Sequence, residues 1–164
     1  MEENTALLEL IAEQSRKLGI EFYPDEIAGK AALVAEFPED NEELPEDCTV
    51  TEEHLSDDSL ELCILITVFS GLDREQTENV TRMTGRLNRF MRLGCFSAIE
   101  GALFLNYTFV LDEEQPAINT LASFFTSLDA LCGSAADARQ QLLPLVKGEL
   151  TCEQLEEQGI YTDN

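Results

Sequence analysis

The single histidine of this sequence, His54, is the first residue whose type suggests chemistry, because imidazole binds metal ions and exchanges protons near neutral pH. Its neighbours Glu52, Glu53 and Asp57 are carboxylates, which also bind metals. A transition-metal site requires several ligands at a defined spacing. One imidazole among the carboxylates of a short segment does not meet that requirement. We therefore expect His54 to be a solvated loop residue, and we expect no metal and no other cofactor.

The acidic run over residues 39–47 suggests a calcium-binding loop. Such a loop alternates oxygen ligands and needs a glycine at its sharp turn, but the sequence has no glycine between Gly29 and Gly71. We expect residues 39–59 to form a solvated, self-repelling acidic loop inserted after the first strand. At most a short strand or turn is indicated near Val50.

Cysteine thiols are the remaining candidates for catalysis. A reactive thiolate needs a neighbouring base or a cationic environment, and one histidine cannot serve five cysteines. Their odd number and wide spacing indicate reduced thiols, mostly buried, rather than a disulfide framework. The sequence contains no phosphate-binding glycine loop, nucleophile elbow or paired-cysteine motif. The five cysteines are Cys48, Cys63, Cys95, Cys132 and Cys152.

The net charge of −23, from 33 acids against 10 lysines and arginines in 164 residues, restricts the partners of this protein. Nucleic acids and anionic membranes would meet a surface of like charge, so we expect neither as a partner. Basic or apolar proteins and peptides remain. The longest strongly apolar run, Leu62–Phe69, is too short to span a membrane. The acidic start, Met1-Glu2-Glu3, is unlike a secretory signal, so we expect a cytoplasmic location.

The charges are unevenly distributed along the chain. Between Ala31 and Asp73 there are 13 acids and no lysine or arginine, whereas residues 74–100 carry five arginines and three acids. Arg82, Arg86 and Arg89 share one face of the helix that we expect over 74–93. We interpret this face as opposing the acidic segment within the chain, with a partner or dimer contact as the alternative.

Hydrophobic periodicity predicts the elements that hold these residues. An α-β-β-α-β-β-α order predicts an α+β fold, with a mainly antiparallel sheet and helices before, within and after it. Residues 1–133 would form this domain, and residues 134–164 a short C-terminal helical extension packed on it, with a last helix over 151–159. We expect helices over 5–18, 74–93 and 112–133, and strands over 31–37, 60–69, 95–99 and 102–111.

The two central strands, 60–69 and 102–111, are largely apolar on both faces. Alternation places Leu65 and Phe69 on the second face of one strand, and Phe104 on that of the other. A half-solvated antiparallel strand would alternate apolar and polar residues, and each large apolar side chain left wet forfeits about 1.5–3 kcal/mol. We therefore expect the second face to be covered by the chain's own tail, by a second copy or by a partner.

A loose motif links the arginine-rich helix to the last two strands. It comprises Leu87-Asn88-Arg89, then Gly94 and Phe96, and then a Glu-Gly turn before residues 103–107. Together with the predicted order of helices and strands over residues 5–133, this motif resembles the YbjN-type domain. That domain is related in fold to the acidic class I chaperones of type III secretion. The resemblance implies an α+β adaptor or chaperone that dimerises and holds extended peptide. None of the family's motifs is catalytic.

These observations favour a non-enzymatic adaptor or chaperone-like protein-binding module that forms a homodimer. Two alternatives remain: a small enzyme that uses clustered carboxylates, and a regulatory domain that binds a small ligand. We expect the apolar face of the 74–93 helix to form the partner or dimer contact. The residues of this candidate contact are Val80, Met83, Leu87, Phe90 and Met91.

Overall fold

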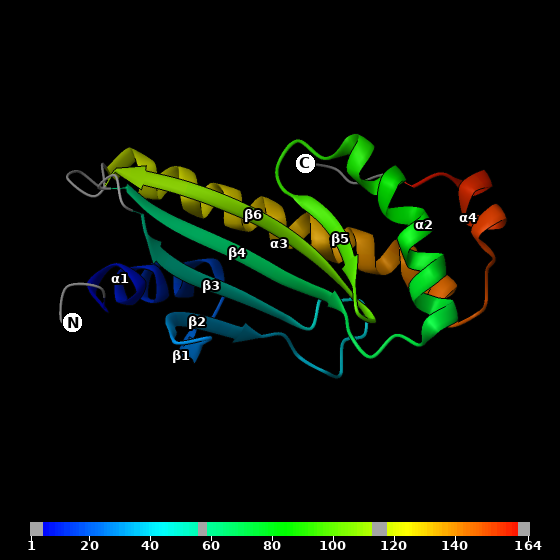
Figure 1. Ribbon diagram of the computed structural model, residues 1–164, viewed down its shortest axis with the longest axis horizontal. Coiled ribbons are helices and arrows are strands. Elements are labelled where there is room, and N and C mark those ends of the chain that lie inside the picture. The colour runs from blue at the N-terminus through cyan, green and yellow to red at the C-terminus, as the bar shows by residue number, and fades with distance from the viewer. Residues whose placement is uncertain (1–4, 56–58, 113–117, 161–164) are drawn as a thin grey trace.

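The computed structural model describes residues 5–55, 59–112 and 118–160, and it has the α+β architecture that the sequence predicts (Figure 1). One antiparallel sheet of six strands has the order β1-β2-β3-β4-β6-β5. The strands are β1 (Tyr23–Ile27), β2 (Lys30–Glu36), β3 (Asp47–His54), β4 (Ser59–Phe69), β5 (Cys95–Ile99) and β6 (Ala102–Asp112). The helices are α1 (Thr5–Ser15), the 3-10 turn η1 (Arg16–Leu18), α2 (Arg74–Phe90), α3 (Ile118–Val146) and α4 (Cys152–Gln158).

Strand β1 was not predicted, and it pairs with β2 in a tight hairpin. Ala28 and Gly29 form the two-residue turn with φ values of 52° and 78°, and the register brings Ile27 opposite Lys30. Two successive positive φ angles are typical of the type I′ turn, whose twist matches that of paired strands. The sequence of β1, Tyr-Pro-Asp-Glu-Ile, lacks the apolar alternation that would have indicated a strand.

Strand β3 occupies the second half of the segment that we expected to be an acidic loop over 39–59. Its side chains alternate, so that Cys48, Val50 and Glu52 are buried while Thr49 and Thr51 lie on the other face. Pairing with β2 on one side and β4 on the other satisfies its backbone groups. The loop itself is therefore confined to residues 37–46, and residues 56–58 lie outside the described part of the chain.

In the described residues, the helices that cover the sheet lie on one of its faces, which we call the core face. Figure 1 shows α1 and α3 behind the sheet, with α2 and α4 at the end where β5 lies. Phe124 of α3 meets Phe109 of β6 edge to face, with ring centroids 6.0 Å apart. Leu8 of α1 joins the same buried cluster as Leu33 of β2.

Helix α3 is longer than predicted, because it continues through Gly133 to Val146. A glycine inside a helix costs only about 1 kcal/mol, and the buried residues on either side, Leu131 and Ala135, hold this segment on the sheet. Pro144 lies in the last turn, where the missing N–H interrupts little of the helix. The proposed division at 133/134 falls inside α3, and the expected helix start over 113–117 lies outside the described residues.

The arginine face of α2 does not oppose the acidic loop as we expected. Arg82 pairs with Glu153 at 2.7 Å and with Glu156 at 3.2 Å, and Arg86 pairs with Glu156 at 3.2 Å. Both acids belong to α4, which begins with the predicted capping box at Thr151. The arginines therefore hold the C-terminal helix against α2.

The turn between α2 and β5 generates a first prediction, on Gly94. This glycine has a φ of +74°, and an added Cβ would lie 2.8 Å from the Asn106 carbonyl oxygen and 2.9 Å from Leu131 Cδ2. We expect Gly94→Ala to lower the free energy of unfolding by about 2 kcal/mol or more, from backbone strain and overpacking. Chemical denaturation followed by circular dichroism measures this change.

The matched control is Gly85, which lies within α2 and has no neighbouring atom within 4 Å of an added Cβ. Because alanine favours a helix over glycine, Gly85→Ala should raise stability by about 0.5–1 kcal/mol. Equal effects of the two substitutions would contradict the described turn.

Candidate functional site

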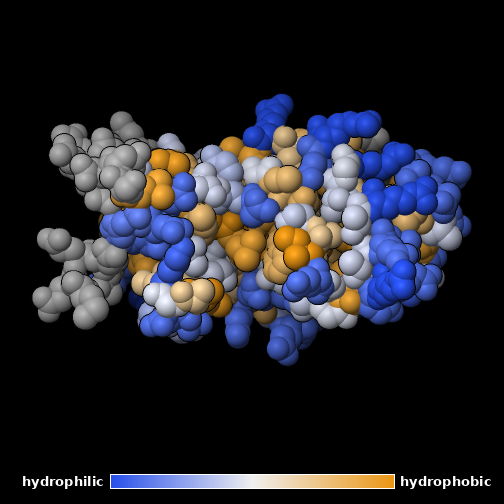
Figure 2. All heavy atoms as spheres, in the orientation of Figure 1, coloured by the Kyte–Doolittle hydropathy of each residue, from blue (hydrophilic) through white to orange (hydrophobic). Residues whose placement is uncertain are grey.

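The face of the sheet opposite α1 and α3, which we call the open face, carries no helix in the described part of the chain. Cross-strand register assigns its side chains: Val34, Thr49 and Leu65 lie side by side on β2, β3 and β4, and Asn106 continues the row on β6. Figure 2 shows hydrophobic side chains gathered over the middle of this face, with hydrophilic ones around them. The expected cover is thus not supplied by any described segment.

The apolar side chains of the open face are partly exposed to solvent. Leu65 is 38% exposed, Tyr23 is 58% exposed and Val110 is 59% exposed, whereas Val34 and Phe104 are half-buried. Threonines separate them, so the face is less apolar than the sequence pattern suggested. A surface of this kind is either simply solvated or covered by another molecule.

Phe69 does not lie on the open face, where strict alternation places it. The register between β4 and β6 shifts between Thr67 and Phe69, so Val68 is the extra residue of a β-bulge. Both Val68 and Phe69 are consequently buried in the core. The bulge thereby removes one large side chain from the second face.

Each edge strand of the sheet has a feature that hinders the addition of another strand at one position. At β5, the side-chain amide of Asn88 donates to the Phe96 carbonyl at 2.9 Å, and the Phe96 N–H donates to Asn88 Oδ1 at 2.7 Å. The Asn88 amide thus occupies both groups that a new strand would use at this residue. At the other edge, β1 contains Pro24, which has no N–H, and the exposed acids Asp25 and Glu26.

Arg139 of α3 fixes the acidic loop to the end of the sheet. It donates to the carbonyl of Glu42 at 2.7 Å and to the carbonyl of Val68, and it lies 3.5 Å from the Glu46 carboxylate. Its guanidinium also stacks over the Phe69 ring, 4.6 Å from the centroid. In addition, Lys147 pairs with Glu42 at 2.7 Å. The cations that compensate the loop therefore come from α3 and from the turn directly after it.

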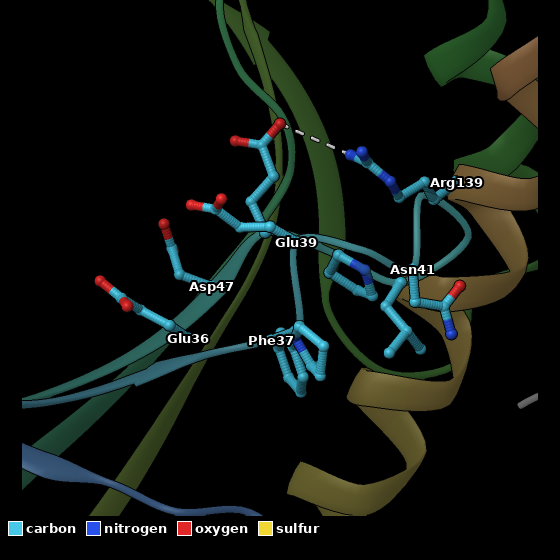
Figure 3. Close-up of a pocket in the computed structure, with 10 residues that line it drawn as sticks. Glu36, Phe37, Glu39, Asn41, Asp47 and Arg139 are labelled. Carbon is cyan, nitrogen blue, oxygen red and sulfur yellow. Dashed lines mark ion pairs between the residues drawn. The ribbon is translucent and has the colours of Figure 1, made fainter.

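The loop and Arg139 enclose a pocket of about 360 Å³ at the end of β2 and the start of β3. Glu36 and Asp47 lie side by side on its strand side, and Arg139 approaches from α3, with its ion pair to Glu46 drawn as a dashed line (Figure 3). The guanidinium is already held by two carbonyls, so it is not available to orient a substrate. The pocket has carboxylates but no second catalytic group beside them.

His54 lies on the core face of β3, at the other end of the strand, where its Nε2 is 2.9 Å from Glu52 Oε1. Glu53 points to the open face and pairs with Lys30 at 2.7 Å, and Asp57 lies outside the described residues. His54 is therefore a strand residue and not the loop residue that we expected. No group of three or more His, Cys, Asp or Glu side chains within the described ranges is arranged to hold a metal ion.

The cysteines are all free thiols, and two of them are buried. A hydrogen bond with the Cys132 thiol, together with burial, raises the pKa of Cys48 well above its ordinary value. Burial also raises the pKa of Cys152. A raised pKa leaves the thiol protonated and poorly nucleophilic, which fits a structural role. Cys95 is exposed and Cys63 is half-buried, on the open face.

The helix face that we expected to contact a partner is mostly buried in the chain's own core. Val80, Met83 and Leu87 have no exposed surface, whereas Phe90 is 46% exposed and Met91 is half-buried. Contact with a partner through Leu87 would require α2 to leave the sheet. This amphipathic face therefore serves the fold.

Sequence reasoning missed two residues that organise the site, Asn88 and Arg139. Asn88 belongs to the motif that carries the resemblance, but its partner Phe96 is known only once β5 lies beside α2. Arg139 is a single cation in a long helix, and its partners lie about 70 to 97 residues away in sequence. Neither residue has a local signal of its role.

Comparisons with known proteins assign no family to the chain. No family model matches it, and no curated protein does. Among solved structures, it is similar to an uncharacterized protein from Methanothermobacter thermautotrophicus, with 18% identity over 86% of this chain and 96% of that chain, and a TM-score of 0.43. None of the helices in the described ranges is long and apolar enough to cross a membrane.

A second prediction concerns Arg139, whose side chain is only 13% exposed. Arg139→Met would leave the Val68 carbonyl and the Glu46 carboxylate without their buried partner, so we expect a loss of about 2–4 kcal/mol of unfolding free energy. Arg82→Met is the matched control, because it breaks exposed ion pairs and should change stability far less. Urea denaturation measures both. A similar loss in the two variants would show that Arg139 is an ordinary surface cation.

A third prediction concerns the edge of β5. Asn88→Ala would leave the N–H and the carbonyl of Phe96 without the amide, and we expect a loss of about 1–3 kcal/mol together with new self-association. Denaturation and analytical ultracentrifugation measure the two effects. Asn106→Ala, which removes an exposed amide bonded to Ser97, should leave both unchanged. A monomeric Asn88→Ala variant of full stability would refute the edge-blocking role.

Proposed function

We propose that this protein is a non-enzymatic protein-binding module, of the adaptor or chaperone-like class, and that it binds its partner on the open face of the sheet. The observation that carries the proposal is the exposed face itself. Leu65 and Val110 are exposed to solvent on the two central strands, whereas the core face of the same strands is covered by helices such as α3. Exposed apolar side chains gathered on one face are typical of an interaction surface.

The two edge strands, β1 and β5, carry features that favour the face of the sheet, and not its edge, as the binding surface. Asn88 occupies the outward groups of Phe96, and Pro24 interrupts the outer edge of β1. Strand addition, a common mode of peptide recognition, is therefore hindered at these two positions. The resemblance to YbjN-type domains and class I chaperones leads to the same class of role.

The alternative of a carboxylate enzyme has less support. Its best candidate pocket, between the acidic loop and Arg139, uses its one cation for the structural contacts described above. Two of the carboxylates that line it are also engaged by the fold, because Asp47 accepts a hydrogen bond from Thr67 at 2.7 Å and Glu46 pairs with Arg139.

The homodimer expected from the sequence stays a prediction. The contact that we assigned to it, around Leu87, is buried within the chain, and two acidic open faces would repel each other. We favour a different protein as the partner. The odd number and wide spacing of the five cysteines favour a reducing compartment, so we propose that this binding occurs in the cytoplasm.

A fourth prediction tests the open face inside cells. A photo-crosslinking amino acid at Thr108, which is exposed on the open face, should give discrete adducts that mass spectrometry identifies. The same probe at Glu9, on the exposed side of α1, should give none. Leu65→Gln should abolish the Thr108 adducts while the melting temperature stays nearly unchanged, because Leu65 is already partly wet.

Two results would contradict the proposal. Adducts that form at Glu9 and not at Thr108 would place the binding surface on the helical side. Thr108 adducts that persist in the Leu65→Gln variant would show that the apolar centre of the open face contributes nothing to binding. Adducts between two copies of the chain would instead support the homodimer.

A further inference from the structure

The side chains of the open face form four cross-strand rows, and on β2, β3, β4 and β6 the charges lie in the outer two. In the first row, Glu36 of β2 lies opposite Asp47 of β3. In the fourth row, Glu53 of β3 lies opposite Glu61 of β4. The two middle rows are uncharged on β2, β3, β4 and β6. Their residues are Val34, Thr49, Leu65 and Asn106, and then Ala32, Thr51, Cys63 and Thr108.

Each outer row contains two acids in directly opposed positions, an arrangement that destabilises a sheet. Lys30, which pairs with Glu53, is the one lysine or arginine in the described strands. Thr67 donates to Asp47 at 2.7 Å, which satisfies an oxygen but brings no positive charge. Over β2, β3, β4 and β6, the open face therefore presents negative potential at both ends of an uncharged, partly apolar middle, and Asp25 of the edge strand β1 lies beside this middle, opposite Ala32.

The backbone of anything that covers this face must satisfy its own hydrogen bonds. An extended segment satisfies them by joining a sheet edge, and here Asn88 hinders this at Phe96 of β5 and Pro24 hinders it on β1. A segment that lies over the middle rows receives no ladder hydrogen bonds, and a buried, unpaired backbone group is costly. A helix makes all of these bonds within itself, as α1 and α3 do on the core face.

The spacing of the acidic rows sets the spacing of the cations in such a helix. Glu53 lies six residues after Asp47 in β3, which corresponds to about 20 Å along the strand. A helix rises 1.5 Å per residue, so two basic side chains about 13 residues apart would reach both rows. Between them, one apolar stripe would lie over Val34 and Leu65.

We infer that the open face takes a cationic amphipathic α-helix of another protein, with basic side chains at both ends of an apolar stripe. This inference rests on the proposed function and adds the chemistry and secondary structure of the partner. Charge complementarity selects this occupant over a second copy of the chain, whose open face carries the same acids. The chain's four helices already lie on the core face or at the β5 end of the sheet (Figure 1).

The test uses three synthetic peptides that share one leucine stripe and differ only at the two ends, which carry lysine, glutamine or glutamate. A fourth peptide has the lysine peptide's composition, but its lysines are half as far apart. We expect the lysine peptide to bind at least about 10-fold more tightly than the glutamine peptide at low salt, and to become helical on binding. Calorimetry, circular dichroism and amide chemical-shift mapping measure affinity, helicity and location.

Two charge-neutralised proteins make the test specific for this face, because both lose four acids. The preference for lysine should nearly vanish in the open-face variant and persist in the control variant. The open-face variant is Glu36→Gln, Asp47→Asn, Glu53→Gln and Glu61→Gln. The control variant is Glu9→Gln, Glu13→Gln, Glu149→Gln and Glu157→Gln, at exposed positions outside the sheet.

The outcomes separate this inference from the proposed function. The inference about charge fails if the glutamine and lysine peptides bind the open face equally, or if the half-spaced peptide binds as well as the lysine peptide. In both cases the open face remains supported as the binding surface. A bound peptide that is not helical overturns the helical partner. Binding that maps to α1 or α2, or no binding of any peptide at about 100 µM, overturns both. Shifts at Thr51 and Thr108 that appear with protein concentration alone would assign the face to a second copy.

Discussion

The carbonyl group of Val68 is the point at which the sheet, the acidic loop and helix α3 are joined. The β-bulge removes this carbonyl from the ladder between β4 and β6, and Arg139 supplies its hydrogen-bond donor. The same guanidinium binds the loop at the Glu42 carbonyl and the Glu46 carboxylate. Because Glu46 leads directly into β3, this contact also positions Asp47, and hence the first acidic row of the open face. One buried cation thus connects the core of the protein to the edge of its candidate binding surface.

Sequence periodicity predicted the elements whose burial is strong and regular. Strand β4 and helix α2 keep their apolar pattern over their whole length, so their type and approximate bounds were correct. Strand β3 was obscured because its outward residues, such as Glu53, made it resemble part of an acidic loop. Strand β1 depends on the turn at Ala28 and Gly29 and has almost no burial of its own. The bulge that turns Phe69 inward follows from pairing with β6, which local sequence does not encode.

The candidate site was predictable only in part, for a related reason. An amphipathic helix face looks the same in sequence whether it packs on the protein's own core or on a partner, and Leu87 turned out to pack on the core. The two-sided apolar character of β4 did indicate an unusual second face, and Leu65 is indeed exposed there. The four acidic positions could not be grouped beforehand, because their grouping depends on the register between β2, β3 and β4.

The placement of those acids explains how an exposed sheet face can remain selective. Its apolar area is modest, since threonines fill much of the two middle rows, so apolar contact alone would discriminate poorly among partners. Two opposed acid pairs weaken the isolated sheet and repel every acidic surface, including the open face of another copy. A cationic partner replaces this repulsion with attraction, so the same four side chains exclude wrong partners and favour a basic one. Since Asn88 and Pro24 also hinder strand addition at β5 and β1, the proposed binding would depend mainly on the charges of the open face.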